Sequence, residues 1–170
     1  TVTVTNQNEA PVITSDGGNA TAAISVSEGT TALTTVTATD ADVPTTLTYS
    51  IVGGADQARF TINAATGVLT FIAAPDYDAP TDVGADNIYN VIVRASDGTL
   101  FDDQAIAVTV TNQNETPVIT SNGGLGTASI SIAESSTTVT TVTATDPDVP
   151  TTLTYIIAGG ADAARFTINA

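Results

Sequence analysis

Residues 2–9 read VTVTNQNE, and the same eight letters return unchanged at residues 108–115. The agreement extends further, because residues 1–64 align with residues 107–170 without a gap and only 16 positions differ. Self-similarity at a fixed period indicates a tandem array of one folding unit. Each unit is long enough to bury a hydrophobic core of its own. Such arrays usually supply length or multivalent binding, because an active site rarely needs copying.

The repeated stretch also divides the chain. Alternating Thr and Val at Thr1–Thr5 predict a strand, and the polar letters after it predict a linker. We expect residues 1–10 to be the closing strand and linker of a preceding repeat, and residues 11–111 to be a complete repeat. Residues 112–117 would form the next linker, and residues 118–170 the N-terminal part of the following repeat.

Apolar and polar residues alternate throughout the repeat, and turn residues such as Gly17 and Gly67 separate the alternating segments. Strands are expected at Ala23–Ser27, Thr34–Thr39, residues 47–51, residues 60–62, Val68–Ile72, residues 89–93 and Ala105–Thr111. Four aromatic residues in or beside these segments are expected in the core: Tyr49, Phe60, Phe71 and Tyr89. About seven strands at this spacing are typical of an antiparallel sandwich. The sequence therefore predicts an all-β fold of tandem Ig-like Greek-key β-sandwich repeats.

The composition describes a folded and strongly acidic protein, with 42% apolar residues and a formal net charge of -15. Only three arginines, with no lysine or histidine, oppose 18 acidic residues, which disfavours nucleic acid and anionic membrane surfaces as partners. No run of 18 apolar residues predicts membrane insertion. Because Cys and His are both missing, a transition-metal site is disfavoured. The acidic surface therefore serves either solubility or the binding of a harder divalent cation.

Two pairs of aspartates, Asp40 with Asp42 and Asp76 with Asp78, fall at expected strand ends. Residues i and i+2 of a strand point to the same face, so each pair can aim two carboxylates at one point. Calcium binds about six to eight oxygen atoms from carboxylates, amides, carbonyls and water. The pairs therefore favour calcium, although a single pair of this kind is also typical of a solvated turn.

The remaining charges are expected on the surface. Asp56 and Asp162 each precede an arginine by three residues, which predicts weak local ion pairs with Arg59 and Arg165. Arg94 alternates outward on its strand. Solvated positions are expected for the remaining aspartates: Asp16, Asp82, Asp86, Asp102 and Asp103, of which only Asp86 is considered as an additional metal ligand.

The letters VTVTNQNETP at residues 108–117 resemble the linker between cadherin repeats, whose pattern is D-x-N-D-N-x-P. They are still more similar to the N-E-x-P variant of bacterial cadherin-like repeats. Other short motifs of the family follow in the same order: Glu28, DAD at residues 40–42, FTIN at residues 60–63, DYD at residues 76–78, and the strand from Tyr89 to Asp97. The resemblance extends over essentially the whole chain.

The resemblance implies Ca²⁺ binding at the junction between consecutive repeats, with two or three ions per junction. The family's ligand positions correspond here to Glu28, Asp76 and Asp78 of the first repeat, to Gln113 (through its backbone oxygen), Asn114 and Glu115 of the linker, and to Asp146 and Asp148 of the second repeat. A junction before the first repeat would use Asn8, Glu9, Asp40, Asp42 and Asp97. Glu134 is the second repeat's counterpart of Glu28.

The resemblance also implies a secreted or cell-surface adhesin, bacterial in type, in which these repeats are a calcium-rigidified extender. Its partners would be neighbouring repeats, with any cell-surface or carbohydrate ligand held by other domains.

An enzyme is disfavoured, because the paired carboxylates of a glycosidase would not recur at each repeat end without an aromatic cleft. Two alternatives stay open: the subunit of an extracellular fibre assembled by strand exchange, and a carbohydrate- or partner-binding β-sandwich module.

Overall fold

The computed structural model describes residues 1–42, 45–148 and 151–169. It divides into two units, Thr1–Gln113 and Asn114–Ala170, and the boundary falls inside the predicted linker. Regular structure in the described residues consists of strands and single-turn 3₁₀ helices. None of these helices is long and apolar enough to cross a bilayer.

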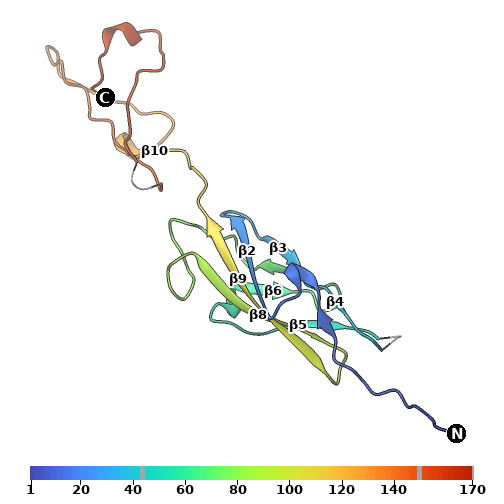
Figure 1. The fold of residues 1–170 in the computed structure, drawn as a ribbon. Helices are drawn as coiled ribbons and strands as arrows, with labels where there is room; N and C mark the ends of the chain where they lie inside the picture. Colours follow the sequence, from blue (N-terminus) through green and yellow to red (C-terminus); the bar gives the residue numbers. More distant parts are fainter. Residues whose placement is uncertain (43–44, 149–150, 170) are drawn as a thin grey trace. The chain divides into compact units, whose positions relative to one another are not determined.

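The first unit is a sandwich of two main sheets (Figure 1). The larger sheet has the order β2-β9-β8-β5, with bounds Thr21–Ser27, Phe101–Thr111, Ile88–Ser96 and Thr48–Gly53. The smaller sheet has the order β3-β7-β6, with bounds Ala32–Thr35, Val68–Phe71 and Phe60–Ile62. Two short strands, β1 (Val12–Ile13) and β4 (Ala38–Thr39), pair with each other, and the 3₁₀ turns are η1 (Ser15–Gly17) and η2 (Gln57–Arg59). The prediction of an all-β sandwich is confirmed.

The prediction of purely antiparallel pairing is wrong at one edge of the larger sheet. β2 runs parallel to β9, with Thr21 opposite Ala105 and Ser27 opposite Thr111. In Figure 1 these two strands lie side by side, β2 in blue and β9 in yellow. Period-two alternation reports which residues share a face but says nothing about strand direction, so the sequence pattern could not reveal this pairing.

Two predicted strands also differ from the structure. The segment Thr34–Thr39 is split, because β3 ends at Thr35 and β4 then begins at Ala38 in a different sheet. Residues Thr1–Thr5 form no strand, and Val2 and Val4 are almost fully exposed. Four of these letters, VTVT, return at residues 108–111 and form the end of β9, because β2 pairs with all of them and β8 pairs with Val108 and Thr109 on the other side. Alternation therefore becomes a strand only where a partner is present.

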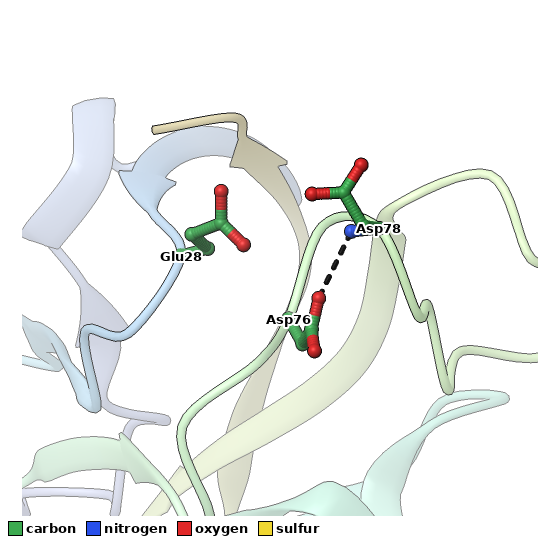
Figure 2. A group of neighbouring side chains, drawn as sticks. All are labelled: Glu28, Asp76 and Asp78. Atoms are coloured by element: carbon green, nitrogen blue, oxygen red, sulfur yellow. Dashed lines mark hydrogen bonds between the residues drawn. The ribbon is translucent and has the colours of Figure 1, made fainter. Parts of the chain in front are cut away.

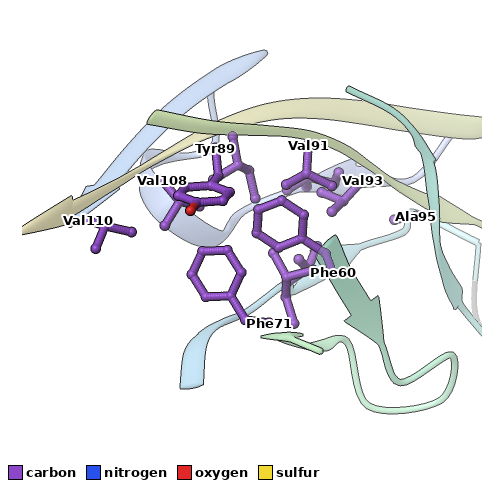
Figure 3. Close-up of a cluster of buried hydrophobic side chains, with 12 residues drawn as sticks. Phe60, Phe71, Tyr89, Val91, Val93, Ala95, Val108 and Val110 are labelled. Carbon is purple, nitrogen blue, oxygen red and sulfur yellow. The ribbon is translucent and has the colours of Figure 1, made fainter. Parts of the chain in front are cut away.

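The core lies between the two sheets and contains three of the four predicted aromatic residues, Phe60, Phe71 and Tyr89 (Figure 3). The fourth, Tyr49, is partly buried and packs against this core. Phe60 stacks on Phe71 with ring centroids 4.8 Å apart, and Phe71 meets Tyr89 edge-on at 5.1 Å. These are the offset and edge-to-face arrangements that aromatic quadrupoles prefer. Valines of β8 and β9, such as Val93 and Val108, complete the buried cluster.

Two turn glycines are required by close backbone contacts. Gly54 and Gly67 have φ angles of 103° and 72°, in the left-handed region that side chains disfavour. A Cβ atom on Gly67 would overlap the carbonyl oxygen of Val36, and one on Gly54 would overlap the backbone of β8 at Asn90. These glycines let the loops approach the sheets closely enough to seal the core.

Buried acids, rather than surface ion pairs, hold the long loop between β7 and β8. Asp56 is only 4% exposed, and its two carboxylate oxygens accept hydrogen bonds from the backbone N–H groups of Val83 (2.7 Å) and Asn90 (2.8 Å). The predicted Asp56–Arg59 ion pair is therefore wrong, whereas Asp162 does pair with Arg165, at 3.3 Å in an exposed position.

Two of the expected solvated aspartates, Asp82 and Asp102, have structural contacts. Asp82 is buried and accepts hydrogen bonds from the N–H groups of Asp86 (3.0 Å) and Asn87 (3.2 Å). Asp102 accepts one from the N–H of Ile13 at 2.9 Å. Sequence spacing does not show which backbone N–H groups reach a carboxylate, so the expectation of open surface is wrong at both positions.

Arg94 also departs from the expectation of an open surface position. It forms a bidentate ion pair with Asp103, at 2.7 and 2.8 Å, and its guanidinium lies 3.4 Å from the ring centroid of Phe101. Both partners come from β9, which pairs with β8 inside the larger sheet. The arginine is therefore half-buried between its two cross-strand neighbours.

The second unit contains fewer paired strands than its sequence pattern predicts. Among its described residues, only β10 (Val118–Ile119) and β11 (Ala144–Thr145) pair, with 3₁₀ turns at η3 (Ser121–Gly123) and η4 (Ala163–Arg165). This pair reproduces the β1–β4 pairing of the first unit in the same register. Longer alternating segments, around Ile130 and Ile157 for example, stay outside any described sheet and are exposed.

Candidate metal centre

One acidic cluster, here called the Glu28 cluster, consists of Glu28, Asp76 and Asp78 of the first unit (Figure 2). Glu28 follows the last residue of β2, and the two aspartates stand in the loop that leaves β7. One carboxylate oxygen from each residue lies within 4.8 Å of the other two. The sequence predicted all three residues, and the fold brings them together from segments nearly fifty residues apart.

Backbone hydrogen bonds fix this geometry. The carboxylate of Glu28 accepts from the N–H of Tyr77 at 2.8 Å and from the N–H of Gln113 at 2.6 Å. Asp76 accepts from the N–H groups of Asp78 (3.0 Å) and Ala79 (3.1 Å), which closes a tight turn. The N–H of Gly29 donates to the carbonyl of Pro75 at 2.9 Å, which ties the loop to the end of β2. The acids are therefore held near one another by the chain itself.

A second cluster, here called the Asp42 cluster, collects polar side chains of the first unit's N-terminal segment and two of its turns: Asn6, Asn8, Glu9, Asp40, Asp42 and Asp97. Asn8 donates to Asp97 at 2.6 Å, and the N–H of Glu9 donates to Asp42 at 2.8 Å. The N–H of Asp42 in turn donates to Asp40 at 2.8 Å. Several of these side chains, with Thr45 and Thr46, line a small open hollow.

Sequence reasoning named five of these six residues and missed Asn6. Its side-chain amide donates to Asp42 at 2.5 Å. Asn6 belongs to the repeated NQNE letters, which indicate a linker but do not show that its side chain reaches Asp42.

Electrostatics in the Asp42 cluster show crowded negative charge. The negative charge of Asp42 raises the pKa of Glu9 above its usual value, because a second anion nearby disfavours ionisation. The N–H of Glu9, aided by the amide of Asn6, lowers the pKa of Asp42. The amide of Asn8, with the N–H groups of Leu100 and Thr99, likewise lowers the pKa of Asp97. Asp42 and Asp97 are therefore stabilised in their ionised forms, while Asp42 and Asp40 repel the neighbouring Glu9, an arrangement that a bound cation would relieve.

A buried oxygen in this cluster also fits a cation. Among the described residues, no hydrogen-bond donor reaches Oδ2 of Asp40, although this atom is buried. A buried carboxylate oxygen without a donor costs free energy unless a cation or water satisfies it. The side chains of both clusters offer a metal ion carboxylate and amide oxygens, which are the ligands that calcium prefers.

The second unit repeats part of this geometry. The N–H of Glu115 donates to Asp148 at 2.7 Å, and the N–H of Asp148 donates to Asp146 at 3.1 Å. Asn114 donates to the carbonyl of Glu115 at 3.0 Å. The structure thus brings four of the predicted ligands together, whereas Glu134 is exposed in a turn and belongs to no group of three or more acids among the described residues.

Comparison with known proteins agrees with this architecture. The family model described as the cadherin domain matches residues 22–116, more than half of the chain. No curated protein sequence matches. Two similar solved structures are the EC1-2 fragment of human protocadherin-24 and the ectodomain of human desmocollin-1. The first is 23% identical over 83% of this chain and 61% of its own, with a TM-score of 0.55. The second is 23% identical over 84% of this chain and 27% of its own, with a TM-score of 0.52.

At this identity the structural likeness shows the shared fold. The chain spans 26% of the length of another solved relative, a protocadherin gammaB7 fragment, so it corresponds to a small part of such ectodomains. The match of the family model carries the assignment, since it includes Glu28, Asp76 and Asp78 and ends in the linker just after Glu115. The chain belongs to the cadherin-domain family.

Proposed function

We propose that the chain is a segment of an extracellular adhesion protein, in which calcium rigidifies the connection between consecutive cadherin repeats. The observation that carries this proposal is the Glu28 cluster, whose three carboxylates converge at the end of the first unit. Domains of this family generally bind calcium and are adhesion modules rather than enzymes. The bacterial surface-adhesin type follows from the linker's resemblance alone and is part of the proposal.

The linker provides the connection. Gln113 donates its N–H to Glu28 in the first unit, while Glu115 donates its N–H to Asp148 in the second. Only Asn114 stands between them in the chain. We therefore propose that calcium uses Glu28, Asp76 and Asp78 together with the linker residues and with Asp146 and Asp148. Without the ion, these carboxylates repel one another and the linker is free to bend, whereas bound calcium holds the repeats in line.

The Asp42 cluster supports the same function for a further junction. Its Glu9–Asp42–Asp40 hydrogen bonds have direct counterparts in the Glu115–Asp148–Asp146 series. A geometry that is built twice at equivalent positions is expected of a site that recurs with each repeat.

A carbohydrate-binding module has less support. Sugar platforms need open aromatic faces, and one of the exposed rings, that of Phe101, is covered by the guanidinium of Arg94 at 3.4 Å. Tyr49, Phe60, Phe71 and Tyr89 are packed in or against the core.

Calorimetric titration of the whole chain with calcium and with magnesium tests the proposal. We expect calcium to bind and to raise the melting temperature, with a much weaker effect of magnesium, because the smaller ion demands a stricter octahedral cage. A ligand at about 100 times its Kd stabilises the folded state by about 2.7 kcal/mol. Melting curves that coincide in calcium and in chelator would contradict the proposal.

Matched variants distinguish a site from a diffuse counter-ion effect. Glu28→Gln removes one charge from the cluster and should weaken calcium binding. Asp16→Asn removes one charge elsewhere and should not. The second repeat already has Asn122 at the position of Asp16, and the threonine hydrogen bond is kept there (Thr140 to Asn122, 3.0 Å). Equal losses in the two variants would indicate a counter-ion effect.

A further inference from the structure

Asn87 is a buried residue that connects three parts of the first unit, and it precedes the first residue of β8. Its backbone N–H donates to Asp82 at 3.2 Å, and its carbonyl accepts from the N–H of Val110 in β9 at 2.9 Å. Its side-chain Nδ2 donates to the carbonyl of Tyr77 at 2.9 Å. With only 9% of its surface exposed, Asn87 is a fixed point between β9 and the preceding loop.

Tyr77 is the residue between the two aspartates of the Glu28 cluster. Its N–H donates to Glu28 at 2.8 Å, while its carbonyl accepts from Asn87. The backbone between Asp76 and Asp78 is therefore held through its N–H by Glu28, a member of the cluster, and through its carbonyl by the uncharged Asn87. Val110, which ties Asn87 to β9, lies three residues before Gln113, the other N–H donor to Glu28.

The residue type suits this position for two reasons. Asn87 has a φ angle of 63°, and asparagine tolerates this left-handed conformation better than most side chains do. The other amide atom, Oδ1, is buried and has no hydrogen-bond partner among the described residues. The side chain thus contributes its N–H donor to Tyr77 at the cost of an unsatisfied oxygen.

We propose that Asn87 is a positioning residue for the calcium site at the Glu28 cluster, which acts by fixing the Tyr77 carbonyl so that the carboxylates of Asp76 and Asp78 converge. This role rests on the proposed function. Groups that orient metal ligands from outside the coordination shell usually change metal affinity strongly when they are removed.

Asn87→Gly tests this role in the full chain. Glycine keeps the left-handed backbone and its two backbone hydrogen bonds, and it removes only the side-chain amide. We expect calcium affinity at the Glu28-dependent site to fall by about 10- to 100-fold, a range typical of such outer residues. In calorimetry, the Glu28-dependent site is the calcium binding that is lost in Glu28→Gln. The calcium binding that remains in Glu28→Gln should be unaffected by Asn87→Gly.

Gln104→Ala is the matched control. Gln104 is fully buried, and its side-chain amide donates to the carbonyls of Asn19 (2.8 Å) and Ser15 (3.3 Å), neither of which belongs to an acidic cluster. This variant should lower the melting temperature without changing calcium affinity. If both variants weaken binding equally, Asn87 acts only through stability and the proposal is overturned.

Asn87→Asp provides a second test if Asn87→Gly does not fold. The added negative charge alone would strengthen calcium binding, so weaker binding reports the lost donor to Tyr77, and unchanged or stronger binding overturns the positioning role. If Glu28→Gln weakens binding and neither Asn87 variant does, only this inference fails. If the unmodified chain binds no calcium, the proposed function fails and the positioning role fails with it.

Discussion

The carboxylate of Glu28 accepts a 2.6 Å hydrogen bond from the backbone N–H of Gln113, 85 residues further along the chain. The contact joins the end of β2 to the first residues of the linker, just after β9 ends at Thr111. Removing it in Glu28→Ala should increase amide hydrogen exchange at Gln113 by about tenfold, which is the effect of one ordinary net hydrogen bond. Exchange measured by NMR without calcium tests this, with Asp16→Asn as the control. Unchanged exchange at Gln113 would show that the linker is ordered by other contacts.

Gly67→Ala should strongly destabilise the first unit. The new Cβ would overlap the carbonyl oxygen of Val36, and φ is 72° at this position. We expect a loss of more than about 2 kcal/mol, since backbone strain of this kind alone costs about 1–3 kcal/mol. Gly98→Ala is the control, because its φ of 98° is also left-handed but no atom lies within 4 Å of the new Cβ. Urea unfolding of both variants should therefore show a clearly larger loss for Gly67→Ala.

The repeated aspartates Asp56 and Asp162 should respond differently to the same substitution. Asp56→Asn replaces one of two buried acceptor oxygens with an NH₂ group that faces a backbone N–H. The free energy of unfolding should fall by about 1.5–3 kcal/mol, which is typical of a lost hydrogen bond to a charged group. Asp162→Asn removes an exposed ion pair with Arg165 and should cost at most about 1 kcal/mol. Thermal unfolding of the two single variants measures the difference, and equal small losses would contradict a buried structural role for Asp56.

Asp82 predicts a specific acid sensitivity. Burial tends to raise the pKa of its carboxyl, but the N–H groups of Asp86 and Asn87 outweigh burial and hold the pKa below the ordinary value of 3.8. A group with a lowered folded-state pKa contributes stability above its unfolded pKa, and this contribution is lost as pH falls through the lower folded value. The stability difference between the native chain and Asp82→Asn should therefore be constant at neutral pH and shrink below about pH 3.8. Denaturant titrations at a series of pH values check this, and a difference that persists at low pH would refute it.

Small-angle scattering should show a longer particle with calcium than with chelator. The expected cause is the proposed loss of bending freedom at residues 113–115, because an ordered linker removes configurations that a flexible one explores. Glu28→Gln should reduce the difference, whereas Asp16→Asn should leave it intact. If the maximum dimension of the native chain is the same with calcium and with chelator, calcium does not stiffen the linker, even if it binds.

Much of the first unit could be predicted because its signals are local. Alternation located β2, β5, β6, β7, β8 and β9 to within a few residues, and Phe60, Phe71 and Tyr89 in those strands do lie in the core. The direction of β2 against β9 and the break between β3 and β4 depend on partners that are distant in sequence. Periodicity carries no information about such partners.

The same distinction applies to the acids. The Glu28 cluster was predicted because its members occupy short recognisable motifs. Asp56 and Asp102 looked like surface residues because their partners are backbone N–H groups from other segments. Asp82 looked like one because its partners, the N–H groups of Asp86 and Asn87, reach it only when the loop folds back on itself. A sequence shows which groups can accept hydrogen bonds, but only the fold shows which donors reach them.

The parallel pairing of β2 and β9 also determines how the repeat would respond to a pulling force. The chain enters this ladder at Thr21 and leaves it at Thr111, at opposite ends of the two strands. Tension applied between the two ends of the unit would therefore slide one strand along the other. All register pairs from Thr21–Ala105 to Ser27–Thr111 would be loaded together, whereas an antiparallel hairpin pulled from its open end would peel apart one pair at a time. The repeat is arranged to resist shear along its own axis.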